Sequence, residues 1–446
     1  MMQSPKRRHR TLAVAGVVAA TALTLAGCSS GANPASSGGN ALSIPAKDPT
    51  ATVSILSYDA LNTDGNQSVI TAFEKAHPTI KIKWESVPSA SLNGAVDADV
   101  SNKSGNPDIY LADQPRISAL ASRGEAEDLT SVFSKYKSTF TPAAYDSGLY
   151  KNKLYALPIS NSTQLLYYNK DLLSKAGLPD PSPAVSARMT WENIATDALK
   201  AHAGGAQYGF VFGQPTAYYQ LEVLPVSLGG SVGASGPGNL TPDFTSPQWV
   251  KAFDWYGQLF KDGASPRGPK DVDSDPDFLA GKTAYMVEGP WLLSELQTSK
   301  INWGVAPQPK FAGGKAATPT GSWSLAMNPF SKEKAAAAIF MKWMAIDNGG
   351  GAIKYNTTST SLPANISGEK YYFDSPMFKT PVGKDAKTII DYEDANTAVN
   401  RVQTIGYIEF ETILDQTFAD ISNGADAKTA LESAKKQVVA AWAKYK

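Results

Sequence analysis

The sequence is poor in the side chains that metal sites and nucleophilic catalysis most often use. Its 446 residues include one cysteine and three histidines, and both Cys28 and His9 lie close to the N-terminus. The other two histidines, His77 and His202, are far apart in the sequence. Zinc sites and Cys/His catalytic pairs need several such side chains together, so we expect no metal, no cofactor and no enzyme of these classes. A lone cysteine also excludes an internal disulfide.

The sequence also lacks an excess of charge of one sign and the glycine-rich loops that bind nucleotides. Lys and Arg together number 41, as do Asp and Glu. Residues 1–27 contain four basic residues and no acidic one, so their removal would leave 37 basic against 41 acidic residues, a formal charge of −4. A mildly acidic chain has no electrostatic reason to bind nucleic acid, and we expect no such partner.

No apolar run after the N-terminal region reaches the roughly 20 residues that a membrane span needs. The long apolar run at residues 11–25 is also short for a span and follows a basic segment at residues 6–10, which is the layout of a secretory signal. It ends in Leu25-Ala26-Gly27-Cys28, which resembles the lipobox of bacterial lipoproteins. We therefore expect a signal peptide over 1–27 and a lipid on Cys28 that anchors the protein to the outer face of the cell membrane. The sequence leaves Sec and twin-arginine export open.

The remaining chain has the composition of a globular protein, 42% hydrophobic and 18% charged, and is longer than one core usually organises. Residues 28–50 are rich in Ser, Gly, Ala, Asn and Pro, which predicts a flexible tether. From there, strand and helix patterns alternate, which predicts α/β architecture that begins with a parallel βαβ unit. The expected strands are 52–56, 80–85, 107–111, 154–158 and 164–168, and the expected helices include 69–76, 116–122, 170–176, one from 335 and one over 431–442.

Aromatic residues are numerous, with 19 tyrosines and nine tryptophans. Tyr167, Trp191 and Trp343 lie within apolar strand or helix patterns and are expected in the core. Others lie in loops beside Gly, Pro or Asn, where flat rings can pack on the apolar faces of sugars while Asp, Asn and Gln bind the hydroxyls. These loop aromatics are Tyr58, Tyr218, Tyr219, Trp291 and Trp323. The alternating aspartates of residues 271–277 lack the Gly and the closing Glu of a calcium loop, so they predict a solvated loop.

Eight short segments, in the expected order, make the sequence resemble the extracellular sugar-binding proteins of bacterial ABC importers. They are Pro-Asp-Ile-Tyr at 107–110, Tyr-Ala-Leu-Pro at 155–158, Tyr-Tyr-Asn-Lys-Asp-Leu-Leu at 167–173, Thr-Trp-Glu at 190–192, Phe-Leu-Ala-Gly-Lys-Thr-Ala-Tyr-Met at 278–286, Gly-Pro-Trp at 289–291, Gly-Val-Ala at 304–306 and Ser-Leu-Pro-Ala at 361–364.

The resemblance implies a two-lobed α/β fold of the periplasmic-binding-protein type II class, with hinge strands and a central ligand cleft. The N-terminal lobe would comprise 51–158 plus 310–346, and the C-terminal lobe 159–309 plus 347–446. The lobes would close over a sugar by hinge bending, and the protein would be a monomer that delivers the sugar to ABC permease subunits without altering it.

The resemblance also implies which residues contact the sugar. Trp291 matches a ring that stacks on the ligand, and Tyr219 matches a second stacking ring, with Tyr218 as the shifted alternative. The other implied contacts are Tyr58, Asp59, Asp113, Gln114, Asn161, Ser162, Thr163 and Trp323. Ala112 and Ser162 replace a tryptophan and an acidic residue of the maltose-binding pattern, so a maltooligosaccharide is not implied.

Two alternatives stay open. The same scaffold could bind a non-sugar solute such as a polyamine, a peptide or an osmolyte, although an anion would need a helix N-terminus or an arginine, for which Arg116 and Arg401 are the candidates. A lipid-anchored glycosidase could use two of the many carboxylates. The sequence does not give the identity, linkage or length of a sugar.

Overall fold

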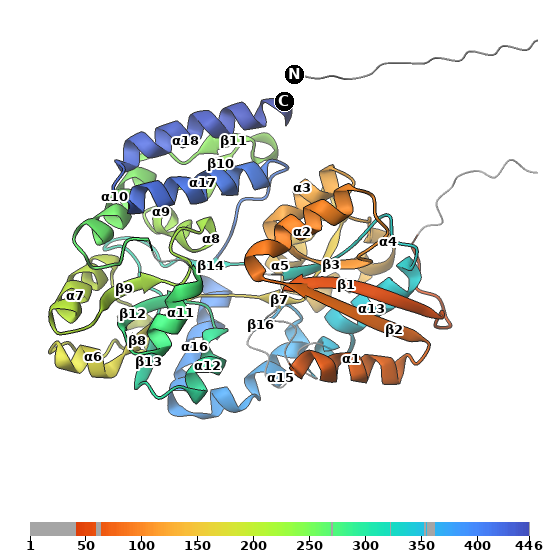
Figure 1. The fold of residues 1–446 in the computed structure, drawn as a ribbon, viewed down its shortest axis with the longest axis horizontal. Coiled ribbons are helices and arrows are strands. Elements are labelled where there is room, and N and C mark those ends of the chain that lie inside the picture. The colour runs from red at the N-terminus through yellow and green to blue at the C-terminus, as the bar shows by residue number, and fades with distance from the viewer. Residues whose placement is uncertain are drawn as a thin grey trace, which may run out of the picture. The chain divides into compact units, whose positions relative to one another are not determined.

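The computed structural model describes residues 42–58, 64–268, 271–321, 323–351, 354 and 362–445. The predicted signal peptide, Cys28 and Asp59 lie outside the described residues, as does most of the predicted tether. Two separate sheets organise the described chain (Figure 1).

The first sheet has five strands in the order β2-β1-β3-β15-β6. Its first three strands are parallel, and β15 is antiparallel to both of its neighbours. The predicted βαβ unit is confirmed, because Ala51 of β1 lies opposite Ile80 of β2 and helix α1 connects the two strands. The bounds are β1 Ala51–Tyr58, α1 Asp64–Ala76, β2 Ile80–Val87, β3 Ile109–Asp113, β6 Ala156–Pro158 and β15 Trp323–Met327.

One hydrophobic core joins this sheet to its helices. The helices are α2 Ser89–Ser101, α3 Ile117–Ser122, α4 Thr130–Phe133, α5 Pro142–Ser147 and α13 Lys334–Ala345. The short hairpin of β4 (Leu149–Tyr150) and β5 (Lys153–Leu154) precedes β6. Trp343 of α13 is buried in this core, as predicted. We call this sheet with its helices the first lobe.

The second sheet has four strands in the order β13-β8-β12-β9 and separates two layers of helices. Alternate side chains of β8 point to opposite faces, so Leu166 and Tyr168 pack into one core and Leu165 and Tyr167 into the other. Tyr167 and Trp191 are fully buried, as predicted. The strands are β8 Leu165–Asn169, β9 Tyr208–Phe212, β12 Thr283–Glu288 and β13 Trp303–Pro307. We call this sheet with its helices the second lobe.

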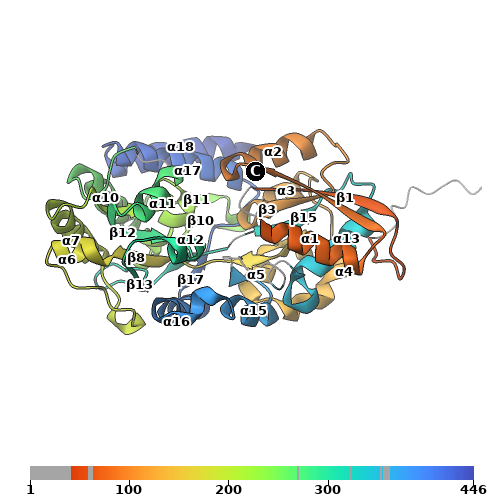
Figure 2. The same ribbon diagram turned by 60° about the horizontal axis from the view of Figure 1, so that its bottom comes forward.

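Helices α17 and α18 lie along one side of the second sheet, and α15 and α16 lie on the other (Figure 2). The helices of this lobe are α6 Lys170–Lys175, α7 Trp191–Ala203, α8 Tyr218–Leu221, α9 Val223–Ser227, α10 Pro247–Lys261, α11 Asp271–Leu279, α12 Leu292–Thr298, α15 Glu369–Phe373, α16 Pro381–Asn396, α17 Tyr407–Ser422 and α18 Ala427–Ala441. A hairpin of β10 (Gly233–Ser235) and β11 (Thr241–Asp243) lies near α18.

Short strands lie where the chain passes between the lobes (Figure 1). The chain runs from β6 through β7 (Ser160–Asn161) into β8, and from β13 through β14 (Thr318–Thr320) into β15. Strand β7 pairs with β16 (Leu362–Pro363), and β14 pairs with β17 (Ala398–Asn400). Two sheets, each with its own helices and cores and joined by such crossings, form the two-lobed α/β fold that was expected.

The residue bounds of the lobes stay a prediction, and the structure adds detail to them. Within the segment 310–346 that was predicted for the first lobe, Phe311 packs into the core of the second lobe and β14 pairs with β17. Strand β15 and helix α13 belong to the first sheet and its core.

The aspartate-rich segment that was predicted as a loop is instead helix α11. Because the segment is helical, the side chains of Ser274 and Phe278 face the protein interior, which the alternating aspartates did not indicate. Phe278 is fully buried against Tyr167, and the buried Ser274 hydroxyl donates to the carbonyl oxygen of Phe212 at 3.3 Å. Among the described residues, no helix is long and apolar enough to cross a membrane.

The packing of α7 on β9 yields a stability prediction. A Cβ added to Gly209 of β9 would lie 2.2 Å from the carbonyl oxygen of Ala198, so Gly209→Ala must displace backbone and should lower the free energy of unfolding by about 1–3 kcal/mol. Gly94 of α2 has open space around it, and Gly94→Ala should raise this free energy by about 0.5–1 kcal/mol. Chemical denaturation of both variants measures the difference, and equal effects would contradict the close contact.

Candidate functional site

The site forms where strand ends of the two sheets meet. In the first sheet, β1 and β3 are parallel neighbours, so Tyr58 and Asp113 lie at the same edge. Trp323, which begins the antiparallel strand β15, lies directly opposite Asp113. The carboxyl ends of parallel strands are the usual position of ligand sites in such sheets. The order of the strands therefore explains why these three predicted residues come together.

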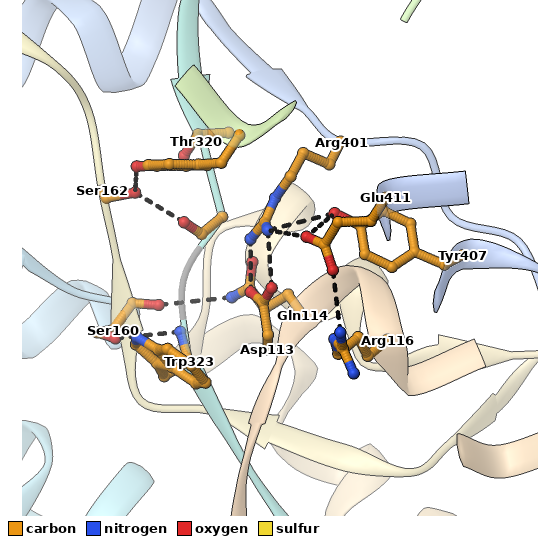
Figure 3. Close-up of polar contacts among 12 residues, drawn as sticks. Asp113, Gln114, Arg116, Ser160, Ser162, Thr320, Trp323, Arg401, Tyr407 and Glu411 are labelled. Atoms are coloured by element: carbon orange, nitrogen blue, oxygen red, sulfur yellow. Dashed lines mark hydrogen bonds and ion pairs between the residues drawn. The ribbon is translucent and has the colours of Figure 1, made fainter. Parts of the chain in front are cut away.

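A buried ion pair links this edge to the second lobe. Both terminal nitrogens of Arg401 donate to Asp113, at 2.7 and 2.5 Å (Figure 3). Arg401 follows β17, and its neighbour Val402 packs into the core of the second lobe. Burial alone would lower the pKa of Arg401, but the Asp113 carboxylate holds this pKa well above its ordinary value. The pair thus connects two segments whose neighbours belong to different cores.

A second ion pair also links the two lobes. Arg116, which follows β3, donates to Glu411 of α17 at 3.1 Å. The other oxygen of Glu411 accepts from the Tyr407 hydroxyl at 2.9 Å and lies 3.8 Å from Arg401 (Figure 3). Both candidate arginines are therefore matched by carboxylates of the opposite lobe.

Tyr219 lies beneath Arg401. The guanidinium carbon is 4.9 Å from the centre of the Tyr219 ring, a cation–π distance. The Tyr219 hydroxyl is 2.7 Å from the Ser162 hydroxyl and accepts from Gln164 at 3.2 Å. Burial raises the pKa of Tyr219 to about 12, although the contacts with Ser162 and Gln164 lower it. Tyr219 is therefore neutral at physiological pH, and its ring orientation is fixed by neighbours.

A chain of buried polar groups connects Tyr219 to Gly289, two residues before Trp291. Gln220 donates to Gln164 at 3.0 Å and to Glu288, at the end of β12, at 3.4 Å. Glu288 in turn accepts from the backbone N–H of Gly289 at 2.7 Å. Gly289 also makes room for the partly exposed Trp291, because a Cβ there would lie 2.1 Å from the indole ring. The Gly-Pro-Trp segment thus places the ring of Trp291 against backbone that carries no side chain.

The crossing segment at Asn161–Thr163 is buried between the lobes. Ser162 donates to the carbonyl oxygen of Gly321 at 2.7 Å (Figure 3). The Asn161 side chain accepts from Thr320 at 2.7 Å and donates to Asp394 of α16 at 2.6 Å. The buried Thr163 hydroxyl has no hydrogen-bond partner among the described residues.

Three further predicted residues lie on the first-lobe side. The rings of Tyr58 and Trp323 pack against each other, with centroids 5.0 Å apart, and both are partly exposed. The buried Gln114 side chain donates to the carbonyl oxygen of Ser160 at 3.5 Å (Figure 3). Together with Asp113, these residues lie at or directly after the ends of β1, β3 and β15 at one edge of the first sheet.

Tyr218 points away from this cluster. Its ring is fully buried and packs edge-on against Phe410, and its hydroxyl donates to the carbonyl oxygen of Val232 at 2.5 Å. Of the two adjacent tyrosines, only Tyr219 contacts other predicted site residues. Because α8 is helical, consecutive side chains point in different directions, and the sequence alone did not fix which of the two contacts the other predicted residues.

Two cavities adjoin the crossing segments. One of about 10 Å³, room for one water molecule, lies beside Arg401, Gln114 and Thr320. A groove of about 630 Å³ lies between α5, α15 and α16, where Asn161, Glu369, Asp391 and Asp394 line it together with apolar residues such as Leu362 and Ile390. Tyr58, Tyr219, Trp291 and Trp323 do not line either cavity. In the described part of the chain, no three His, Cys, Asp or Glu side chains group so that they could hold a metal ion.

Sequence reasoning identified only part of the polar network. Arg401 was considered only as a ligand for anions, and Gln164, Gln220, Glu288, Tyr407 and Glu411 were not identified. These residues lie in helices or at strand ends without a short motif, and only the fold brings them together. Their polarity within otherwise apolar stretches is the one sequence signal that could have marked them.

Comparisons with known proteins identify the family of the chain. The family model described as "Bacterial extracellular solute-binding protein" matches residues 60–347. The chain belongs to this family. A maltodextrin-binding protein of Bacillus subtilis is 28% identical over 364 residues, which cover 78% of this chain and 79% of that protein. A maltooligosaccharide ABC transporter solute-binding lipoprotein of Streptococcus pneumoniae is 25% identical, over 81% of this chain and 82% of that protein.

Solved structures show the same fold for this solute-binding protein. An ABC substrate-binding protein of Listeria monocytogenes, solved in complex with cycloalternan, has a TM-score of 0.76 at 21% identity. The match covers 87% of this chain and 98% of that one. The two-lobed architecture of this solute-binding protein is therefore that of its family.

The contact between Asn161 and α16 predicts how stability depends on pH. Burial and the nearby Asp391 raise the pKa of Asp394 from 3.8 to about 6. Because the folded state holds this proton more tightly than the unfolded state, Asp394 lowers stability as pH rises from about 4 to about 6. Asp394→Asn keeps an acceptor for Asn161 and should raise the melting temperature at neutral pH more than at acidic pH. A melting-temperature gain that is equal at every pH would contradict the raised pKa.

Proposed function

We propose that this protein is the extracytoplasmic binding subunit of an ABC importer and that it captures a sugar between its two lobes. The observation that supports the proposal is the set of residues at the strand ends of the two lobes: Tyr58 and Trp323 pack together at the edge of the first sheet, while Tyr219 and Trp291 flank a chain of buried amides and a carboxylate in the second lobe. Rings that stack on sugar faces and polar groups that bind hydroxyls are the elements of a carbohydrate site. The names of its relatives support the same ligand class.

The electrostatics favour an uncharged ligand. Arg401 is paired with Asp113 and Arg116 with Glu411, so neither arginine offers an unmatched charge to an anion. Tyr219 is neutral and adds no charge to the site. Each buried polar group that a ligand leaves without a hydrogen bond costs about 1–3 kcal/mol, so the site should favour ligands whose hydroxyls match these groups. An anionic solute would have to break a buried pair, which is far more costly than binding a neutral one.

Entry of the ligand requires the lobes to separate. The space beside Arg401 holds about one water molecule, and the ion pairs bridge the two lobes in this conformation. Separation about the crossing strands β7 and β14 would admit the sugar, and closure over it would form the complex that the permease subunits recognise. The lipid on Cys28 would hold the monomeric protein at the membrane, with residues 28–50 as the tether.

A glycosidase that uses two carboxylates stays the enzyme alternative, whereas specific contacts disfavour a serine hydrolase. Residues 229–233 match Gly-x-Ser-x-Gly, but the Ser231 hydroxyl donates to the carbonyl oxygen of Asp243 at 2.8 Å. The described histidines lie elsewhere, with His77 bonded to Asp48 and His202 to the carbonyl oxygen of Ala206. Incubation with candidate glycans tests this alternative, because sustained product release would show an enzyme and overturn binding without chemistry.

The ligand prediction concerns Trp291. A neutral mono- or oligosaccharide should raise the melting temperature of the wild-type protein, because a ligand that binds only the folded state stabilises it. Trp291→Ala should weaken binding by about 2 kcal/mol, roughly thirtyfold, as expected for a stacked anchor residue. Titration calorimetry with the saccharide that gives the largest thermal shift measures this loss. Tyr392→Ala, which removes an exposed ring on α16, is the control and should bind like wild type. Undiminished affinity of the Trp291 variant would remove this residue from the site.

The anchor prediction concerns Cys28. In a bacterial host that processes lipoproteins, the wild-type protein should fractionate with membranes. Cys28→Ala should shift it to the soluble fraction, because no other segment is expected to hold it there. Saccharide binding by the released protein should be unchanged. A variant that stayed in the membrane fraction would contradict the lipid anchor.

A further inference from the structure

The carboxyl ends of β9 and β12 place a glutamate directly against a glycine. The two strands are parallel neighbours, and the backbone N–H of Gly213, the residue after β9, donates to the carbonyl oxygen of Val287 at 2.9 Å. Glu288, the last residue of β12, is buried beside it. A Cβ added to Gly213 would lie 1.4 Å from Oε2 of Glu288, and its three nearest atoms would all belong to the Glu288 side chain. Gly213 therefore leaves the room that Glu288 occupies.

Glu288 in turn holds the segment that carries Trp291. Its Oε1 atom accepts from the backbone N–H of Gly289 at 2.7 Å. The carbonyl oxygen of Gly289 accepts from the buried Tyr167 hydroxyl at 2.8 Å. The indole of Trp291 packs so closely on Gly289 that a Cβ there would lie 2.1 Å from the ring. Because Gly289 is hydrogen-bonded through both its N–H and its carbonyl group, the backbone surface against which the indole packs is fixed.

The same oxygen of Glu288 also connects this segment to Tyr219. It accepts from the side chain of Gln220 at 3.4 Å, and Gln220 donates as well to Gln164 at 3.0 Å. Gln164 donates to the Tyr219 hydroxyl at 3.2 Å. A single carboxyl group thus lies between the two rings of the second lobe that are proposed to contact the sugar.

We propose that Glu288 is a positioning residue for sugar binding and that Gly213 is required because it leaves room for this carboxyl group. The Glu288 side chain is only 2% exposed, so it acts through Gly289 and Gln220 and does not touch the sugar. Displacing Glu288 should therefore change the orientation of Trp291. The proposal rests on the proposed function in that Trp291 and Tyr219 contact the ligand.

Gly213→Ala and Glu288→Ala should disturb the site by the same route. The obstacle to a methyl group at position 213 is the end of a side chain, so Gly213→Ala should displace Glu288 and leave the fold intact. Glu288→Ala removes the acceptor for the N–H of Gly289. Each substitution should weaken saccharide binding by about tenfold, as expected where one buried hydrogen bond is lost.

The double variant shows whether the two residues act as a pair. Once Glu288→Ala has removed the obstacle, Gly213→Ala should weaken binding by no more than about twofold further, whereas two independent effects would multiply to about a hundredfold. Titration calorimetry of the two single variants and the double variant measures this coupling.

Fluorine NMR of the ligand-free full-length chain reports the environment of Trp291 directly. Fluorotryptophan with the fluorine on Cζ2 leaves free the three ring atoms that pack nearest to Gly289, which are Cε3, Cζ3 and Cη2. Among the nine tryptophan resonances, the one that is lost in Trp291→Phe belongs to Trp291. This resonance should shift or broaden in Gly213→Ala and in Glu288→Ala, and the double variant should resemble Glu288→Ala.

Gly209→Ala is the matched control, because it adds a methyl group within β9 that meets the backbone of Ala198 and not Glu288. It should lower stability but leave the Trp291 resonance and the saccharide affinity unchanged. An unmoved Trp291 resonance in Gly213→Ala and Glu288→Ala, an equal shift in Gly209→Ala, or affinity losses that multiply in the double variant would overturn the proposal. The spectra are recorded without ligand, so failure to bind any saccharide would overturn the proposed function and leave the positioning of Trp291 testable.

Discussion

The buried guanidinium of Arg401 is the constraint around which the meeting of the two lobes is organised. A cation removed from water needs a countercharge at close range, and the nearest carboxylate, Asp113, belongs to the other lobe. The pair therefore satisfies Arg401 only while the lobes are in contact. The electrostatic stabilisation of Arg401 by Asp113 therefore depends on whether the two lobes are in contact.

This constraint explains the composition of the surrounding cluster. Tyr219 offers a π-face to Arg401 and must remain neutral, which its burial ensures. Tyr407 and Glu411 extend the network to Arg116, so that cations and carboxylates alternate across the boundary. Tyr58, Trp323 and Trp291 are partly exposed, and Trp323 lies opposite Asp113 in the first sheet. The proposed site would thus offer a ligand aromatic rings and matched charges, with little net charge.

The fold was largely predictable from the sequence because its signals are local. The periodicity of residues 52–85 predicted the first βαβ unit, and apolar patterns placed Tyr167, Trp191 and Trp343 in cores. Helix α11 was missed because its aspartates alternate like a solvated loop, while the burial of Phe278 and Ser274 depends on tertiary packing. Where only one or two side chains hold a helix or strand in the core, tertiary contacts decide its secondary structure more than the local sequence pattern does.

The candidate site was less predictable because its order comes from topology. Tyr58, Asp113 and Trp323 are distant in sequence and become neighbours only through the pairing of β1, β3 and β15. Arg401, separated from Asp113 by 288 positions, has no motif at all.

The same reasoning explains why Glu222 was not identified from the sequence. A glutamate beside an apolar helix is expected at the surface, yet Glu222 has no exposed surface, and its carboxyl oxygens have no hydrogen-bond partner among the described residues. Its burial depends on how the helices of the second lobe pack around α8, and no local pattern in the sequence encodes that packing.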